Sequence, residues 1–409
     1  MSKALVSTEE KRSLGRLVLP ALFVSRFAIE PPGILTGLLL IDIGATFGCS
    51  VGVMGQVRTV SYVVAVVSAL LMGILSVRFK HRSLLMMGLL FVSISALACF
   101  FAWNFNVMLL SYSMSGLGMA MVAPMTFTLV ADYFPLEKRA ALIGWLIAGS
   151  ALAYLVGSPV IGLIEGLGGW RLAFLGFVLP VSMVSLLLTA QGLPSISSSE
   201  QPTMSKRSYL EGFKEVFSSR SADACLIGTA LSMAAWQAIL LFSSSFQRQR
   251  FQASTGLASV ILLISAVIYI LGSLSGGRIA RRVGMKPLTV STAFLASIFI
   301  VSYTSPPSLW LSVALSFLGC LFSGMLSTAF SSLTLEQVPR FRGTMMSVLS
   351  AASNMGSAFG TGIGGLALLL FNYEGMAISL GVMGLAGAVV FHLLAIDPTR
   401  TEARVLNAS

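Results

Sequence analysis

Two charged residues stand four positions apart in the first long apolar stretch of the chain, Arg26 and Glu30. This spacing puts both side chains on one face of a helix, where an ion pair lowers the cost of removing each charge from water. A charge at the centre of a membrane costs about 2.5–3.5 kcal/mol on insertion scales, and such residues commonly handle protons, ions or substrates. We therefore predict that Glu30 binds a proton or a substrate and that Arg26 tunes it. A static ion pair is the alternative.

Two prolines follow this pair directly, Pro31 and Pro32. Proline has no N–H, so the carbonyls one turn earlier lose their helical donors. Irregular backbone at membrane depth is tolerated where it is buried in protein or lines a watery cavity, and broken helices often form transporter sites. The sequence thus predicts a helix break beside a carboxylate at mid-depth.

Arg58 is the third charge within an apolar stretch. We expect it to pair with Glu30 in another conformation, to contact an anionic substrate, or to extend toward the outer interface. The second half of the chain offers milder groups for substrate contact, and aromatic and amide side chains of this kind suit an amphiphilic ligand. The candidates are Trp236, Gln237, Ser243–Ser245, Tyr269 and Asn354.

The elements that position these residues are apolar helices. Hydrophobic residues make up 56% of the 409 positions and charged residues 10%, whereas about a quarter of a soluble domain is charged. Twelve apolar stretches are each long enough to cross a ~30 Å hydrocarbon core. They lie near 17–40, 50–76, 83–103, 107–131, 140–165, 171–193, 222–246, 253–277, 286–305, 309–334, 343–371 and 375–396. We predict an all-α integral membrane protein.

A segment rich in serine and charge, 194–221, separates the first six stretches from the last six. We therefore expect two six-helix bundles, 1–193 and 222–409, joined by this linker on the cytoplasmic side. The linker contains an amphipathic piece, Tyr209–Phe217, that we expect to lie along the membrane surface.

The net charge of +11 reflects topology. With the N-terminus in the cytoplasm, 21 of the 26 Lys and Arg residues fall in cytoplasmic segments, which is the positive-inside bias. This pattern predicts a multi-pass protein of the cell (plasma) membrane, with both termini cytoplasmic, and argues against a nucleic-acid partner. The chain has two histidines and lacks a phosphate-cradling Gly-Lys-Ser/Thr loop. We expect no enzymatic activity, no cofactor and no metal.

The same pattern recurs in both halves at a constant offset of 204 residues. Gly73 matches Gly277, Arg78 matches Arg282, Arg82 matches Lys286, Asp132 matches Glu336, and Pro135 matches Pro339. A register kept over five positions indicates a duplicated unit, and duplicated membrane units are typical of secondary transporters.

Four segments of the chain resemble the major facilitator superfamily. The loops at 73–82 and 277–286 resemble its Gly-x-x-x-Asp-Arg-x-Gly-Arg-Lys motif, 131–139 resembles the loop between its fourth and fifth helices, and 168–174 resembles the entry into its sixth helix. The resemblance implies a twelve-helix fold of two pseudo-symmetric bundles and transport by alternating access. It implies gating roles for Gly73, Arg78, Arg82, Asp132, Arg139, Gly277, Arg282 and Lys286.

The chain departs from the family pattern at three positions. Val77 and Arg281 stand where the motif has an acidic residue, and Tyr112 stands where many proton-coupled members have an arginine. We keep Tyr112 as a candidate site residue. The segment with Gly157, Pro159 and Gly162 resembles a signature that goes with antiporters in this superfamily.

These residues predict a secondary transporter, working as a monomer, that exports a small amphiphilic compound or metabolite in exchange for protons. Two alternatives stay open. An organic-anion symporter or uniporter of the same fold is favoured by the intramembrane charge, since Arg26 and Arg58 outnumber Glu30. A non-transporting receptor or scaffold is favoured by the missing motif carboxylates.

Overall fold

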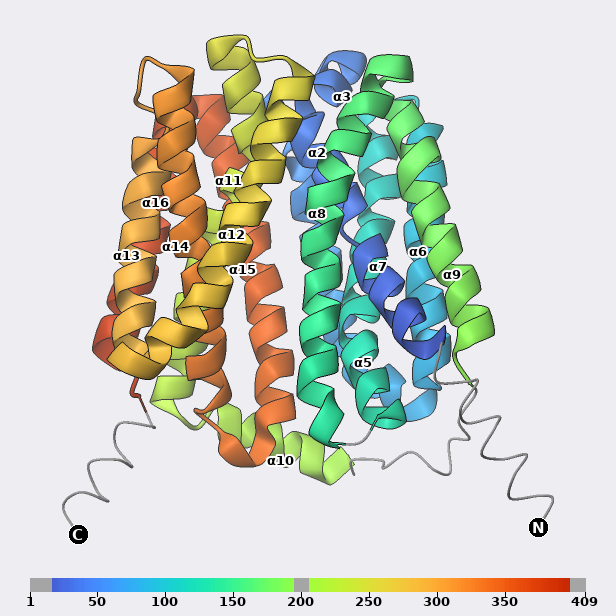
Figure 1. The fold of residues 1–409 in the computed structure, drawn as a ribbon, viewed down its shortest axis with the longest axis vertical. Coiled ribbons are helices and arrows are strands. Elements are labelled where there is room, and N and C mark those ends of the chain that lie inside the picture. The colour runs from blue at the N-terminus through green and yellow to red at the C-terminus, as the bar shows by residue number, and fades with distance from the viewer. Residues whose placement is uncertain (1–16, 135, 195–205, 398–409) are drawn as a thin grey trace. The chain divides into compact units, whose positions relative to one another are not determined.

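The computed structural model describes residues 17–134, 136–194 and 206–397, although the side chains of several residues within its helices are not described. Each of the twelve predicted apolar stretches is helical over most of its length (Figure 1). By length and composition, ten helical spans in this described part could cross a membrane. One of them, Leu142–Gly192, covers two of the predicted stretches.

The first predicted stretch is broken into pieces. A helix covers 17–28, α2 covers Pro31–Leu38 and α3 covers Leu40–Phe47. The next stretch begins with the single turn α4 (Val51–Met54) and continues as α5 (Gln56–Arg78). Residues Ile29 and Glu30 lie between the first two helices, so the predicted break beside the carboxylate is confirmed.

Four further helices complete the first half of the chain. They are α6 (His81–Phe100), α7 (Phe105–Tyr133), α8 (Leu136–Ala173) and α9 (Leu179–Gly192), with the π-helical turn η1 (Phe174–Val178) before α9. Gly168 and Gly169 interrupt α8 with non-helical torsions, and Gly169 has a φ of 76° that favours glycine. This interruption separates the fifth predicted stretch from the sixth.

The second half starts with the amphipathic helix α10 (Lys206–Val216). The long helices that follow are α11 (Arg220–Phe251), α12 (Thr255–Val283), α13 (Met285–Ser302), α14 (Leu309–Leu335), α15 (Arg342–Leu370) and α16 (Tyr373–Leu394), with the short turn η2 (Pro339–Phe341) before α15. Helix α10 packs on α15, and its residues Phe213 and Val216 belong to the apolar core of this half.

Contacts divide the chain into two compact units. The first unit comprises Met1–Ile43 and Val63–Thr203, and the second comprises Gly44–Tyr62 and Met204–Ser409. The second unit therefore includes α3's last residues, α4 and the start of α5. Helix α4 packs on α15 within this unit.

The internal repeat is visible in the local structure. Ser50 caps α4 by accepting a hydrogen bond from the amide of Val53 at 3.4 Å, and Ser254, 204 residues later, caps α12 in the same way through Leu257 at 3.2 Å. Helices α7 and α14 also begin 204 residues apart. Equivalent positions in the two halves can thus be compared through this register.

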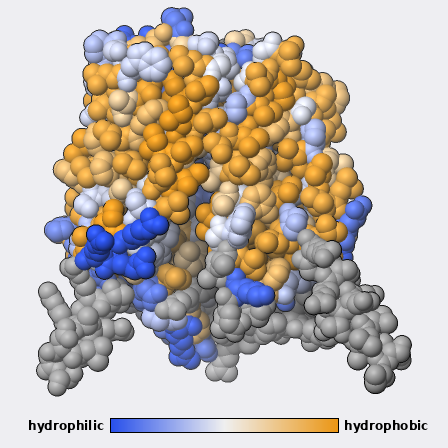
Figure 2. Space-filling model, in the orientation of Figure 1, coloured by the Kyte–Doolittle hydropathy of each residue, from blue (hydrophilic) through white to orange (hydrophobic). Residues whose placement is uncertain are grey.

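Hydrophobic side chains dominate the middle of the face shown in Figure 2, and hydrophilic ones gather toward its ends. Many large apolar residues are exposed, including Leu110 at 71% and Leu163 at 71%. In water such a surface would aggregate, whereas in lipid it is the expected one.

Candidate transport site

The helix break places Glu30 at the start of α2. The carbonyl of Phe27, which Pro31 cannot serve, accepts a hydrogen bond from the Glu30 amide at 3.2 Å. The carbonyl of Glu30 in turn accepts from Gly33 and Ile34 at 2.9 and 3.1 Å. The break thus satisfies these backbone groups locally and leaves the Glu30 side chain at a bend of the chain.

Arg26 and Glu30 form an ion pair in the first unit. Arg26 Nη2 lies 3.9 Å from Glu30 Oε1, and the two side chains are 19% and 22% exposed. The guanidinium also lies over the ring of Phe127 from α7, 5.8 Å from its centroid. Arg26 Nε is buried and has no hydrogen-bond partner among the described residues. The pair is long for a salt bridge and only partly satisfied, an arrangement in which a further ligand could bind.

Tyr112 lies next to the same broken helix. It is 2% exposed, and its hydroxyl is 3.2 Å from Thr36 Oγ1 of α2. The hydroxyl of Thr36 also lies 3.0 Å from the carbonyl of Pro32 and can donate to it. Tyr112 therefore connects α7 to the proline segment through neutral hydrogen bonds, where an arginine would bring a charge.

Arg58 lies in the part of α5 that belongs to the second unit. It is 8% exposed, and its Nη2 donates to the hydroxyl of Tyr62 at 2.6 Å. The Tyr62 hydroxyl donates to Gln237 Oε1 of α11 at 3.1 Å. Arg58 is therefore buried within a hydrogen-bonded chain here, and the expectation that it extends to the interface is not met.

The other candidates of the second half come from three helices. Trp236 of α11 stacks on Tyr269 of α12, with ring centroids 5.2 Å apart and an interplanar angle of 17°. Asn354 is half-buried on α15. Helices α11, α12 and α15 thus carry one aromatic pair and two amides, all without net charge.

Two residues at the start of α6, His81 and Arg82, each make a polar contact in the first unit. His81 Nδ1 and Asp132 Oδ2 are hydrogen-bonded at 2.7 Å. Arg82 donates to the carbonyl of Ala190, near the end of α9, at 2.5 Å, as expected for a cation at a helix C-terminus. Burial raises the pKa of Tyr133 to about 12, although the nearby positive charge of Arg82 acts to lower this pKa.

For three predicted gating residues the structure describes the helical backbone alone. Gly73 and Arg78 lie on α5, and Arg139 lies on α8. Their gating roles stay predictions.

The second copy of the loop motif is built differently. A Cβ added at Gly277 would lie 3.8 Å from Thr328 Cγ2, an ordinary van der Waals distance, and Arg282 is exposed. The amides of Met285 and Lys286 both donate to Asp397 Oδ2, at 3.0 and 3.2 Å. A carboxylate from beyond α16 thus caps the N-terminus of α13.

The predicted antiporter-like segment lies inside α8. Pro159 keeps helical torsions, and the non-helical residues of this helix are Gly168 and Gly169. A side chain at Gly157 would lie 3.2 Å from Ile34 of α2, so the glycine permits close packing of α8 on the broken helix. Gly162 is half-buried on the same helix.

Sequence reasoning missed Thr36, Tyr62, His81 and Asp397 as partners. Each pairs with a residue far away in sequence, so no local spacing marks the contact. His81 was treated only as part of a basic loop. Among the described residues, no group of three His, Cys, Asp or Glu side chains could hold a metal ion.

Comparison with known proteins identifies relatives over most of the chain. The family model described as "Major Facilitator Superfamily" matches residues 21–340 and 225–408. The "Uncharacterized MFS-type transporter YwfA" of Bacillus subtilis (strain 168) is 22% identical over 375 residues, which cover 90% of each chain. Among solved structures, the D-xylose-proton symporter has a TM-score of 0.76 at 15% identity, covering 93% of this chain and 98% of its own. The nucleoside transporter NupG has a TM-score of 0.75 at 16% identity, covering 93% and 99%.

Proposed function

Because this chain belongs to the major facilitator superfamily and is a multi-pass membrane protein with that twelve-helix fold, we propose that it exports a small amphiphilic compound in exchange for protons. The observation that carries the proposal is the ion pair between Arg26 and Glu30 beside the break in the first helix. Placing two charges inside an apolar bundle costs free energy, and such residues commonly mark the path of a proton or a substrate.

The chemistry of the exchange follows from the carboxylate. When Glu30 is ionised, it attracts Arg26 and can accept hydrogen bonds from a substrate or take up a proton. When Glu30 is protonated, its charge no longer attracts Arg26, and the guanidinium keeps its contact with the Phe127 ring. A proton and a substrate that both need the carboxylate exclude each other, which is the requirement for antiport.

Neutral groups are further candidates for substrate contact within each unit. Tyr112 lies beside the broken helix in the first unit, whereas Trp236, Gln237, Tyr269 and Asn354 lie on helices of the second unit. The aromatic pair offers stacking and the amides offer hydrogen bonds, which together suit a ligand with an apolar body and few polar groups. We place the protein in the plasma membrane, as a monomer with cytoplasmic termini.

The experiment is substrate-triggered proton flux in proteoliposomes that contain a pH-sensitive dye. Cationic, neutral and anionic compounds are screened with the wild type, with Glu30→Gln and with Glu374→Gln, a control at an exposed carboxylate in the first turn of α16. We expect the active compounds to move protons with the wild type and the control, and the Glu30 variant to move none. Unchanged proton flux in Glu30→Gln at all pH values would refute the role of this carboxylate.

A second candidate function is uptake of an organic anion without a role for Glu30. The buried position of Arg58 favours it, since this cation lies at 8% exposure beside Tyr62 and Gln237. In that case anions compete for transport of the labelled compound and cations do not. Loss of this competition in Arg58→Ala would select the second candidate over the first.

A further inference from the structure

The ion pair of Arg26 and Glu30 leaves hydrogen-bonding capacity unused. An N–H···O hydrogen bond spans about 2.7–3.2 Å, whereas Arg26 Nη2 and Glu30 Oε1 are 3.9 Å apart. The two groups therefore attract each other without sharing a hydrogen bond. Arg26 Nε is buried and has no hydrogen-bond partner within the part of the chain that the structure describes. The two side chains are 19% and 22% exposed, so a ligand can reach them.

The separation of these two atoms fits a single hydroxyl group between them. A hydroxyl oxygen accepts one hydrogen bond and donates another. Two such bonds of about 2.8 Å each span at most about 5.6 Å, so the 3.9 Å separation closes the bridge with an angle of about 90° at the hydroxyl oxygen. One hydroxyl oxygen can therefore accept from Arg26 Nη2 and donate to Glu30 Oε1 at the same time.

The charges of Arg26 and Glu30 cancel, so the pair as a whole favours an uncharged ligand. A cation bound at Glu30 lies close to the guanidinium, and an anion bound at Arg26 lies close to the carboxylate, because the two groups are 3.9 Å apart. At equal distances the repulsion between like charges is as large as the attraction between unlike charges. A hydroxyl group avoids this repulsion, and its hydrogen bond to an ionised carboxylate is charge-assisted.

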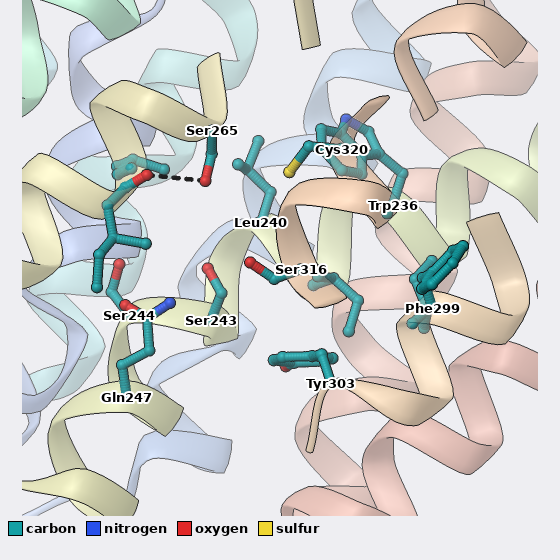
Figure 3. A pocket seen from close by; sticks show the side chains of 15 residues that line it. Trp236, Leu240, Ser243, Ser244, Gln247, Ser265, Phe299, Tyr303, Ser316 and Cys320 are labelled. Carbon is teal, nitrogen blue, oxygen red and sulfur yellow. Dashed lines mark hydrogen bonds between the residues drawn. The ribbon is translucent and has the colours of Figure 1, made fainter. Parts of the chain in front are cut away.

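A cavity within the second unit is too small to be the substrate site. It lies between α11, α12, α13 and α14 (Figure 3), and it offers about 30 Å³ to the centres of water-sized molecules. One water molecule needs about 10–15 Å³ by this measure, so the cavity has room for about two. An organic substrate does not fit there in the described conformation, and the pair in the first unit is the candidate that the contacts support.

Building on the proposed function, we propose that the exported compound is an uncharged alcohol whose hydroxyl group bridges Arg26 and Glu30. In the loaded state Glu30 is ionised and the two charges sum to zero. When the alcohol leaves and a proton binds Glu30, the carboxyl group is neutral and the site carries the single positive charge of Arg26. One proton enters for each alcohol molecule that leaves, so each cycle moves one positive charge inward. A membrane potential of about 100 mV then raises the attainable outward gradient by about fiftyfold.

The test compares three probes that share a six-carbon chain, namely hexanol, hexylammonium and hexanoate. Their affinities are measured by ligand-observed saturation-transfer NMR on the protein in phosphatidylcholine nanodiscs, with empty nanodiscs as the blank. We expect the wild type to bind hexanol about tenfold more tightly than either ion. A tenfold ratio corresponds to about 1.4 kcal/mol, which is at the lower end of the repulsion between two unit charges about 4 Å apart.

The variants change the net charge of the site in a known direction. Arg26→Gln leaves the carboxylate of Glu30 unpaired and should make hexylammonium the most tightly bound probe. Glu30→Gln leaves the guanidinium unpaired and should make hexanoate the most tightly bound probe. Arg26→Lys keeps both charges and should keep the preference for hexanol, as should Glu374→Gln, the control at an exposed carboxylate of α16. A purely structural ion pair would not change the preferred probe in this order.

Charge movement is measured separately, by solid-supported membrane electrophysiology of proteoliposomes. We expect a jump in hexanol concentration to give a transient current with the wild type and none with Glu30→Gln. The proposal is overturned if the wild type binds either ion most tightly, if it binds no probe above the blank, or if protons move without a current. A preference for hexanol without any proton flux would instead refute the transport function and support the hydroxyl site, so the two failures are distinguishable.

Discussion

The ion pair of the first helix can be tested with a double-mutant cycle in which Arg26→Gln and Glu30→Gln are made singly and together. Glutamine keeps the volume of glutamate and much of that of arginine but removes the charge. If the two charges stabilise each other, each single variant leaves one charge unpaired inside the bundle. The double variant removes both charges. Its loss of stability is therefore expected to be smaller than the sum of the losses in the two single variants.

The structure sets the size of this effect. Two unit charges 3.9 Å apart attract each other by about 4 kcal/mol at an effective dielectric constant of 20 and by about 1 kcal/mol in bulk water. Because both side chains are about a fifth exposed, solvent screens part of the attraction. We expect a coupling free energy of about 2 kcal/mol.

The assay is equilibrium unfolding in mixed micelles, followed by tryptophan fluorescence, for the wild type and the three variants. Losses that add within about 0.5 kcal/mol would refute the reasoning, since they would mean that the two groups do not interact. The same proteins go into the proton-flux assay. A double variant that regains stability but moves no protons would separate the role of Glu30 in coupling from its role as a partner of Arg26.

Three further outcomes follow from the packing. Gly360→Val on α15 places a side chain against the carbonyl of Ala234 on α11 and should lower the free energy of unfolding by about 1–3 kcal/mol. An unchanged free energy of unfolding would show that α11 and α15 can move apart to accommodate the side chain. Asp132→Asn weakens the hydrogen bond between Asp132 and His81, whose two side chains are 10% and 14% exposed, respectively. We expect it to lower the free energy of unfolding by about 1–3 kcal/mol, checked by the same unfolding measurement with His81→Gln for comparison. Tyr112→Ser leaves a cavity in the first unit and should cost about 3–5 kcal/mol, and a loss below 1 kcal/mol would contradict the tight packing of its ring.

Much of the fold could be predicted because it depends on local patterns. Runs of apolar residues mark the helices, and the lack of an N–H in Pro31 and Pro32 fixes the break next to Glu30. The spacing of Arg26 and Glu30 is a property of one helix, so the ion pair between them was also predictable. The offset of the internal repeat could be found because it requires only a comparison of the two halves of the sequence.

The partners that were missed depend on which helices meet. Tyr62 bonds to Gln237 across 175 positions of the chain, and His81 bonds to Asp132 across 51.

Helix α5 limits how the two units can move, because it belongs to both. Its residues up to Tyr62 group with the second unit and those from Val63 with the first, yet α5 is one helix from Gln56 to Arg78. If the units rock during transport, either α5 bends near this point or its first turns leave the second unit. The chain has no glycine or proline between Gln56 and Gly73, and sharp bends usually need one or the other.

Small residues bring this part of the chain close to α15. A side chain at Gly52 would lie 2.6 Å from the carbonyl oxygen of Gly365, and Thr59 Oγ1 lies 3.0 Å from Thr361 Oγ1. Glycine permits this close approach of two helices, and the apolar side chains of Val51 and Met54 are buried beside it. Substitutions that enlarge Gly52 or Gly365 should therefore push α4 away from α15 and lower the free energy of unfolding, which the unfolding measurement would detect.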